Sequence, residues 1–327
     1  MSNWFIVACH TSCAYNNLPC LFAAYDNYMP MRFTLIALTL LLSFECSASR
    51  WSPPEYSGTK TDAELEEMSG LAASQIHKDV LWVVNDGGNG EKLIAMRDDA
   101  TRIATFNLKG VKNIDWEDLA SFKLKGKNYI LIPDTGDNGG IRKSLQIYVF
   151  EEPKELSDGQ TLEPAWSFDF VWPDGARDCE AVAVDAAKGE ILLISKKRVP
   201  PELFRLPLQP SAKNVTAVKI GELPGIAQPT TKEMEKNPVY GRYRSQITAA
   251  DLSPNGRVLM VLNYHSVYFY VREVAGGWTT ALSSKPDSFS FPWLPQAEAI
   301  SFNREGTAIY IGSEQRPVPL LRYRIIR

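Results

Sequence analysis

Five short runs of apolar residues recur along the chain and are separated by longer, more polar stretches. They occupy residues 81–84, 129–132, 191–194, 258–262 and 308–311. Runs of this length are too short for a buried helix and are typical of strands that are covered on both faces. The pattern therefore predicts an all-β protein whose sheets pack face to face.

A second segment precedes each apolar run and also recurs. It opens on a polar residue and continues into small and apolar residues, as in SGLA from residue 69 and EAVA from residue 180. The five opening residues are Ser69, Glu117, Glu180, Thr248 and Glu298. They lie roughly 50 to 70 residues apart, whereas a four-stranded propeller blade needs about 40–50 residues. The repeat predicts a β-propeller of four-stranded antiparallel blades, with five blades expected and six left open.

Glycines mark the turn between the two strands in four of the five copies. They are Gly126, Gly189, Gly256 and Gly306. The two longest intervals between copies predict insertions, at residues 151–173 and 227–244. The stretch before Ser69 is expected to complete the last blade and close the ring.

The first part of the chain has the pattern of a processed segment. Residues 31–48 combine a basic start, an apolar stretch at 33–44 and a small-residue site, as in secretory signal peptides. We expect residues 1–30 to be an extension of the gene model, 31–48 a signal peptide and 49–327 the propeller domain. The protein is then exported, to the periplasm or the extracellular space. A lipoprotein attached at Cys46 is the alternative, which Glu45 disfavours.

Composition narrows the range of functions. Four of the five cysteines lie in the first 46 residues, so Cys179 is the one left after cleavage and no internal disulfide is expected. The formal net charge is −3 and no basic stripe is present, which argues against nucleic-acid binding. We expect no integral membrane segment after signal cleavage.

Two sets of polar positions are expected to meet at the mouth of a central channel. One set comprises the opening residues, and the other follows the five apolar runs, where Asp86, Asp134, Lys196, Tyr264 and Glu314 stand. Antiparallel pairing brings the start of one strand beside the end of the next. Several carboxylates close together repel one another unless a cation is bound. Oxygen ligands suit Ca²⁺, and the candidate metal ligands are Glu117, Glu180, Asn263 and Glu298.

The residues after the second apolar run form the most acidic loop of the chain. Asp134, Asp137, Asn138 and Arg142 are candidate ligand-binding residues there. A basic run in the next repeat adds Lys196, Lys197 and Arg198, which suit an anionic group. A purely structural interpretation stays open: the basic run neutralises Glu180, and Arg142 neutralises Asp137.

Several motifs together resemble those of a family of exported bacterial β-propeller proteins. They are SGLA from residue 69, WEDLA from residue 116, and DTGDN from residue 134 with Arg142. The resemblance covers most of the chain after the signal peptide. At the level of the fold, the chain is similar to phytase-like, strictosidine-synthase-like and lactonase propellers. This similarity implies Ca²⁺ near the channel and hydrolytic chemistry there.

Two functions follow from these observations. The first is binding of a small ligand, a metal ion or a partner at the channel mouth, without catalysis. The alternative is a calcium-dependent hydrolase, a phosphoesterase or a lactonase-like enzyme, with Glu180, Glu298 and His265 as candidate catalytic residues. His77 is expected in a surface turn, and Cys179 is expected to be a structural thiol. The sequence favours binding and leaves open whether the protein is an enzyme.

Overall fold

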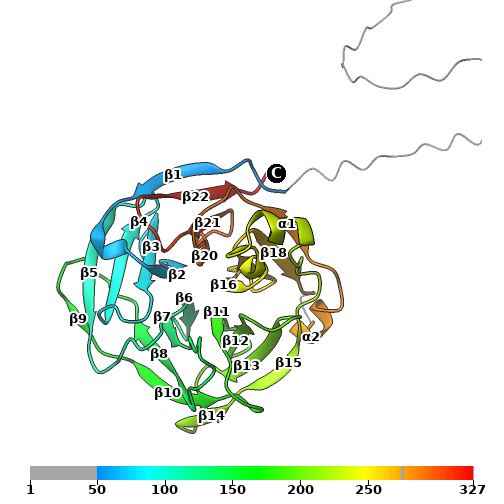
Figure 1. Ribbon diagram of the computed structural model, residues 1–327. Coiled ribbons are helices and arrows are strands. Elements are labelled where there is room, and N and C mark those ends of the chain that lie inside the picture. The colour runs from blue at the N-terminus through cyan, green and yellow to red at the C-terminus, as the bar shows by residue number, and fades with distance from the viewer. Residues whose placement is uncertain (1–49, 274–275, 327) are drawn as a thin grey trace, which may run out of the picture. The chain divides into compact units, whose positions relative to one another are not determined.

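The computed structural model describes residues 50–273 and 276–326. Within these residues, five sheets follow one another around a common axis (Figure 1). The predicted all-β propeller is confirmed, and the number of blades is five. The predicted extension (1–30) and signal peptide (31–48) lie outside the described residues.

We number the blades by the order of their innermost strands, which face the axis in Figure 1. Blade 1 consists of β2 (Met68–Ala73), β3 (Val80–Asn85), β4 (Lys92–Arg97), β5 (Arg102–Leu108) and β9 (Thr161–Leu162). Blade 2 consists of β6 (Ala120–Leu124), β7 (Lys127–Asp134), β8 (Leu145–Glu151), β10 (Trp166–Val171) and β14 (Asn214–Thr216). Blade 3 consists of β11 (Cys179–Asp185), β12 (Glu190–Ser195), β13 (Glu202–Pro207) and β15 (Val218–Glu222).

The last two blades are built in the same way. Blade 4 consists of β16 (Ile247–Leu252), β17 (Val258–Asn263), β18 (Ser266–Val271) and β19 (Asp287–Ser290). Blade 5 consists of β20 (Ala299–Phe302), β21 (Ala308–Gly312), β22 (Val318–Arg324) and β1 (Glu55–Lys60). Two short α-helices, α1 (Thr231–Lys236) and α2 (Trp278–Ala281), and 3₁₀ turns at Ala63–Leu65 and Gly241–Tyr243 lie between strands.

The ring is closed by the strand before the first repeat, as expected. β1 pairs antiparallel with β22 and forms the outer edge of blade 5 (Figure 1). Blade 5 thus contains strands from both ends of the described chain, and its backbone hydrogen bonds hold the first and last blades together.

Of the two expected insertions, one is confirmed and the other is confirmed only in part. Residues 227–244 are an insertion that contains α1 and a 3₁₀ turn. Residues 151–173 are an insertion only in part, because they include β10, which is the fourth strand of blade 2. The additional residues there carry β9, which pairs in parallel with β5 of blade 1. The error arose because β10 begins on a tryptophan beyond a polar link, without the apolar run that marks the second strands.

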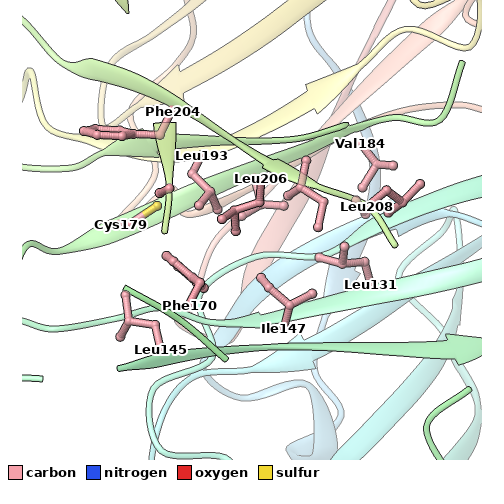
Figure 2. Close-up of a cluster of buried hydrophobic side chains, with 14 of the residues drawn as sticks. Leu131, Leu145, Ile147, Phe170, Cys179, Val184, Leu193, Phe204, Leu206 and Leu208 are labelled. Carbon is pink, nitrogen blue, oxygen red and sulfur yellow. The ribbon is translucent and has the colours of Figure 1, made fainter. Parts of the chain in front are cut away.

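The hydrophobic core lies between blades. Five clusters of buried side chains fill the five junctions between neighbouring blades, including the junction of blades 5 and 1. Figure 2 shows the cluster between blades 2 and 3, where Ile147 and Phe170 face Leu193 and Phe204. Burial of apolar surface at about 25 cal/mol per Å² makes these junctions the main source of stability.

Cys179 belongs to this cluster and is fully buried. Burial raises the pKa of its thiol to about 12, so the reactive thiolate is suppressed at neutral pH.

The predicted turn glycines are also confirmed, since Gly126, Gly189, Gly256 and Gly306 all have positive φ angles between 65° and 84°.

Candidate functional site at the entry end of the propeller

We call the end of the propeller at which each innermost strand begins the entry end. The opening residue of the repeat has a special place there. The pairing register of β2 with β3 shifts between Met68 and Gly70, so Ser69 is the extra residue of a β-bulge. Glu180 and Thr248 occupy the same place in blades 3 and 4. A bulge leaves its extra residue unpaired and redirects its side chain, which frees these positions for other contacts.

A backbone hydrogen bond joins the two predicted sets of polar positions in four blades. In each of these blades, a residue just beyond the end of the second strand donates its backbone N–H. The acceptor is the carbonyl oxygen of the residue two positions before the opening residue. The pairs are Glu67 with Asp86, Asp115 with Thr135, Asp178 with Lys196, and Gln296 with Glu314. The expectation that the two sets meet at one end is therefore confirmed.

A hydroxyl group from the preceding blade positions each of the three glutamates. The carbonyl of Trp116, just before Glu117, accepts a 2.9 Å hydrogen bond from Ser69. The carbonyl of Cys179 accepts one of 2.8 Å from Thr135. The carbonyl of Ala297 accepts one of 2.8 Å from Thr248. Ser69 and Thr248 thus stabilise the junction between blades.

Asp118 ties three blades together beneath the entry end. Its Oδ2 accepts hydrogen bonds from the backbone of Val182 (2.7 Å) and Ala250 (3.1 Å), and its Oδ1 accepts one from Leu119 (2.8 Å). Complete burial raises the pKa of this carboxyl well above its usual range, although the three N–H donors oppose the shift. The role of Asp118 is to satisfy backbone groups where the innermost strands converge.

Two groups of carboxylates lie at the entry end with the spacing of metal ligands. One is Asp86, Asp115 and Glu117, and the other is Glu117, Asp178 and Glu180. Within each group, one oxygen per residue lies within 4.8 Å of the others. The expected proximity of Glu117 and Glu180 is therefore present in the structure.

Glu117 belongs to both groups and is the most unusual residue of the site. Its side chain is only 4% exposed, yet no described residue donates a hydrogen bond to it or forms a salt bridge with it, and the charge of Lys196 acts on it only from beyond ion-pair distance. Burial raises the pKa of Glu117 well above its usual range, and the nearby Asp86 raises it further. A buried carboxylate without a partner is costly, which marks this position as a site for a cation or a proton.

The carboxylates of blade 3 carry lysine partners. Lys196 pairs with Oε1 of Glu180, as the structural interpretation expected, and its amine lies 6.0 Å from the ring centre of Tyr264. Lys197 pairs with Asp178 at 2.8 Å. Oε2 of Glu180 is buried and has no hydrogen-bond partner among the described residues. This group is only partly neutralised. Arg198, the last of the basic run, lies farther out, with its Nε 3.8 Å from Glu202.

The acidic loop of blade 2 satisfies its own polar groups. Asp134 is paired with Arg142 at 2.7 Å and also accepts backbone N–H bonds from Ile114 and Asp115. Asp137 accepts the backbone N–H groups of Ile141 (2.8 Å) and Arg142 (3.0 Å). The expected ion pair of Arg142 with Asp137 is therefore made with Asp134 instead.

Asn138 completes this loop. Its backbone and side-chain oxygens both accept from Lys197, at 3.1 and 2.7 Å. The loop also contacts both carboxylate groups, because the backbone N–H of Asp137 donates to Oδ1 of Asp178 (2.8 Å) and Asp134 accepts the backbone N–H of Asp115 (3.2 Å). Its role in binding a ligand stays a prediction.

Blade 5, which packs against blade 1, contributes a second pair of carboxyls, Glu298 and Glu314. The charge of Glu298 adds to burial in raising the pKa values of Asp86 and Glu117. Tyr264 donates a hydrogen bond to Glu298, and Gln296 donates one to Glu314. Burial, and then the hydrogen bond to Glu298, raises the pKa of Glu314 to about 10. Glu298 belongs to neither group of carboxylates described above.

Asn263 is the last residue of β17, and His265 lies in the turn between β17 and β18. Oδ1 of Asn263 accepts the backbone N–H groups of His265 (3.0 Å) and Ser266 (2.7 Å). The ring of His265 contacts the hydroxyls of Ser266 and Ser290 through Nδ1, and burial lowers its pKa. His77 lies in the β2–β3 turn, at the other end of the blade, with Nε2 2.9 Å from the carbonyl of Pro153.

Three residues of the two carboxylate groups were not among the candidates from the sequence, namely Asp86, Asp115 and Asp178. A signal for two of them exists. Blades 2 and 3 both carry an aspartate two residues before the glutamate, as DWE from residue 115 and DCE from residue 178. The corresponding residue of blade 5 is Gln296, so the Asp-x-Glu pattern separates the blades that contribute to the acidic groups.

The fold and this site define a five-bladed β-propeller with two linked carboxylate groups at its entry end. No family model matches the chain, and no curated protein sequence matches it. Among residues 50–273 and 276–326, no helix is both long and apolar enough to cross a membrane.

Proposed function

We propose that this protein binds a divalent cation, with Ca²⁺ as the first candidate, through Glu117, Asp178 and Glu180 at the entry end. The observation that carries the proposal is the buried carboxylate of Glu117, which has no partner among the described residues although two further carboxylates lie beside it. A divalent cation would offset the repulsion and satisfy the free oxygens of Glu117 and Glu180.

The chemistry of the ligands favours a hard cation. Both groups consist of carboxylates, without histidine or cysteine, whereas zinc sites are built mainly from those two residue types. Ca²⁺ takes six to eight oxygen ligands, so three carboxylates leave positions for water or for an oxygen of a bound ligand. The protein would then use the ion to hold an anionic group.

The surroundings of the site support a ligand or partner with apolar parts. Ile141 and Trp293 are each 81% exposed. Ile141 lies between β7 and β8, and Trp293 lies between β19 and β20. Both links are at the entry end, because each follows a strand that ends there. Exposed large apolar side chains near a polar site are typical of binding surfaces.

Thermal unfolding with Ca²⁺ and with a chelator tests the cation. A ligand that binds only the folded state at a hundred times its dissociation constant stabilises it by about 2.7 kcal/mol. We expect the melting temperature to rise with Ca²⁺ concentration and to return on chelation. The same melting temperature under both conditions would overturn the proposal.

We propose a calcium-dependent hydrolase, a phosphoesterase or lactonase, as the second function. It is favoured by the set of Tyr264, Glu298 and Glu314, which places hydrogen-bonded carboxyls at the same end as the proposed cation site. A bound cation would polarise a phosphoryl or carbonyl oxygen, and a carboxyl of this set would supply or accept a proton. Turnover of phosphate esters or lactones that requires Ca²⁺ and is lost in Glu298→Gln would support it, and no turnover would leave the binding function alone.

We also propose that the protein is exported, as the pattern of residues 31–48 indicates. Sequencing the N-terminus of the mature protein tests this, and a mature chain that still begins upstream of residue 31 would contradict it.

A further inference from the structure

The two carboxylate groups at the entry end form one continuous row across three blades. Asp86 comes from blade 1, Asp115 and Glu117 precede β6 of blade 2, and Asp178 and Glu180 belong to the start of blade 3. Glu117 stands in the middle, within 4.8 Å of the ligand oxygens on both sides. A carboxylate has two oxygens with about four lone-pair sites, so one side chain can serve two ions.

The row is uneven in positive charge. Both lysines of the site pair with its blade 3 end, Lys196 with Glu180 and Lys197 with Asp178. Among the described residues, no lysine or arginine pairs with Asp86, Asp115 or Glu117. Lys196 lowers the pKa values of these three carboxyls against the larger effect of burial, and Arg142 lowers that of Asp115, but both act from beyond ion-pair distance. A single cation at the blade 3 end would therefore leave the other end of the row only weakly compensated.

Two glycines allow the backbone to pack closely against the carboxylates at this other end. A Cβ atom at Gly136 would lie well inside van der Waals contact with Oε1 of Glu117 and Oδ2 of Asp115. A Cβ at Gly87 would lie 2.6 Å from Oδ1 of Asp115. Neither glycine has a positive φ, so the need for glycine comes from space around the carboxylates and not from the backbone conformation.

The carboxylates beside these glycines have free oxygens. No described residue donates a hydrogen bond to the side chain of Asp115 or Glu117, and Glu117 is only 4% exposed. A buried carboxylate that lacks a partner and faces two further carboxylates is an independent sign of a missing cation. It distinguishes this group from an ordinary acidic surface.

We infer that the entry end holds two divalent cations, one between Asp86, Asp115 and Glu117 and the other between Glu117, Asp178 and Glu180, with Glu117 bridging them. The inference rests on the proposed function and extends it from one ion to two. The shared glutamate explains why Glu117 alone belongs to both groups. It also explains why the lysine partners are confined to one end of the row.

Counting bound ions tests the inference. The full chain, stripped with a chelator, is dialysed against Ca²⁺ alone, and bound calcium is measured per chain. We expect two ions for the wild type and one for Asp86→Asn or Asp178→Asn. Glu117→Gln should bind neither ion tightly, and Glu298→Gln, which lies outside both groups, should keep two.

The outcomes separate the two proposals. One ion in the wild type, retained by Asp86→Asn and lost in Asp178→Asn, would overturn the second site and leave the proposed function standing. No bound ion would overturn both. Circular dichroism checks that each variant is folded. A second readout uses Tb³⁺ and Eu³⁺ together: energy transfer between them requires two neighbouring ions, and its absence in the wild type would contradict the bridged pair.

Discussion

The two sides of the entry end use the same backbone positions for different purposes. Glu117 and Glu298 both open a repeat, and both follow a residue whose carbonyl accepts a hydroxyl hydrogen bond from the preceding blade. Glu298 receives a hydrogen bond from Tyr264, whereas Glu117 receives none from any described residue. The fold therefore places a glutamate at the entry end on both sides. Neighbouring side chains determine whether its carboxylate receives a hydrogen bond from the protein.

The difference comes from a few side chains around the glutamates. Blade 5 has Gln296 two residues before Glu298, and its amide donates to Glu314. Blades 2 and 3 have Asp115 and Asp178 in the corresponding position, which add negative charge. An amide supplies hydrogens where a carboxylate can supply none. The carboxyls on the side of Glu298 thus receive hydrogen bonds from the protein, whereas those on the side of Glu117 lack them, which is the basis for the cation that we propose there.

The substitution Glu117→Gln should have the largest effect on calcium binding. It removes the charge shared by both carboxylate groups, so we expect the stabilisation by Ca²⁺ to disappear. At a hundred times the dissociation constant this is a loss of about 2.7 kcal/mol, or roughly 5–10 °C in melting temperature for a domain of this size. Without Ca²⁺ the variant should be at least as stable as the wild type, because a neutral amide replaces a buried carboxyl whose ionisation is costly. Calorimetry with and without chelator measures both effects.

The matched control is Glu298→Gln. A glutamine there still accepts the hydrogen bond from Tyr264, and Glu298 lies outside the two groups. The full calcium-dependent shift is expected to remain. If the two variants lost the shift equally, the two sides of the entry end would not differ as proposed.

The space around Glu117 is tested by Gly136→Ala. The added methyl group would collide with the carboxylates of Glu117 and Asp115, so we expect at least a tenfold weaker calcium affinity, about 1.4 kcal/mol. Gly139→Ala in the same loop is the control, since its methyl would meet only Ile141, at an ordinary distance of 3.6 Å. Isothermal titration with Ca²⁺ gives both affinities, and equal values would argue that the methyl is accommodated.

Most of the fold could be predicted from the sequence because the signal repeats. The second strands are continuous apolar runs, and the turn glycines recur at nearly fixed positions after the opening residue. β10 and β9 escaped prediction for the opposite reason. They lie in the outer parts of blades, β10 between β8 and the short β14, and neither contains a continuous apolar run. β9 also pairs with a different blade from the one that encloses it in the chain.

The site could be predicted only in part. The opening glutamates stood out because their positions recur, but Asp86 lies beyond the end of β3 and reaches Glu117 only through the packing of blade 1 on blade 2. The satisfied state of Asp134, Asp137 and Asn138 could not be inferred either. It depends on loop geometry that brings backbone N–H groups and Lys197 onto their oxygens.

On the side of Glu298, we expect the stability of the protein to depend on pH. The pKa of Glu314 is raised to about 10, first by burial and then by the hydrogen bond with Glu298. A folded-state pKa above the unfolded value gives stability that is complete below the unfolded pKa and is lost as pH rises. With chelator present, we expect the free energy of unfolding to fall by more than about 1 kcal/mol from pH 5 to pH 8. In Glu314→Gln this fall in the free energy of unfolding should be smaller. Urea unfolding at several pH values measures it, and the same pH dependence in the variant and the wild type would show that Glu314 does not retain its proton.

The smallest expected effect on calcium affinity comes from removing the hydroxyl groups that position the glutamates. Thr135→Val removes the hydrogen bond to the carbonyl of Cys179, beside Glu180, and Thr248→Val removes the one to Ala297, beside Glu298. Each leaves a buried carbonyl unsatisfied and should cost about 1–2 kcal/mol of stability. Only Thr135→Val should also weaken calcium binding, by roughly two- to fivefold, since a displaced Glu180 lies in a proposed ligand group and a displaced Glu298 does not. Paired calorimetry and titration measure this, and equal loss of affinity in both variants would mean that general loosening of the ring, and not the position of Glu180, controls the ion.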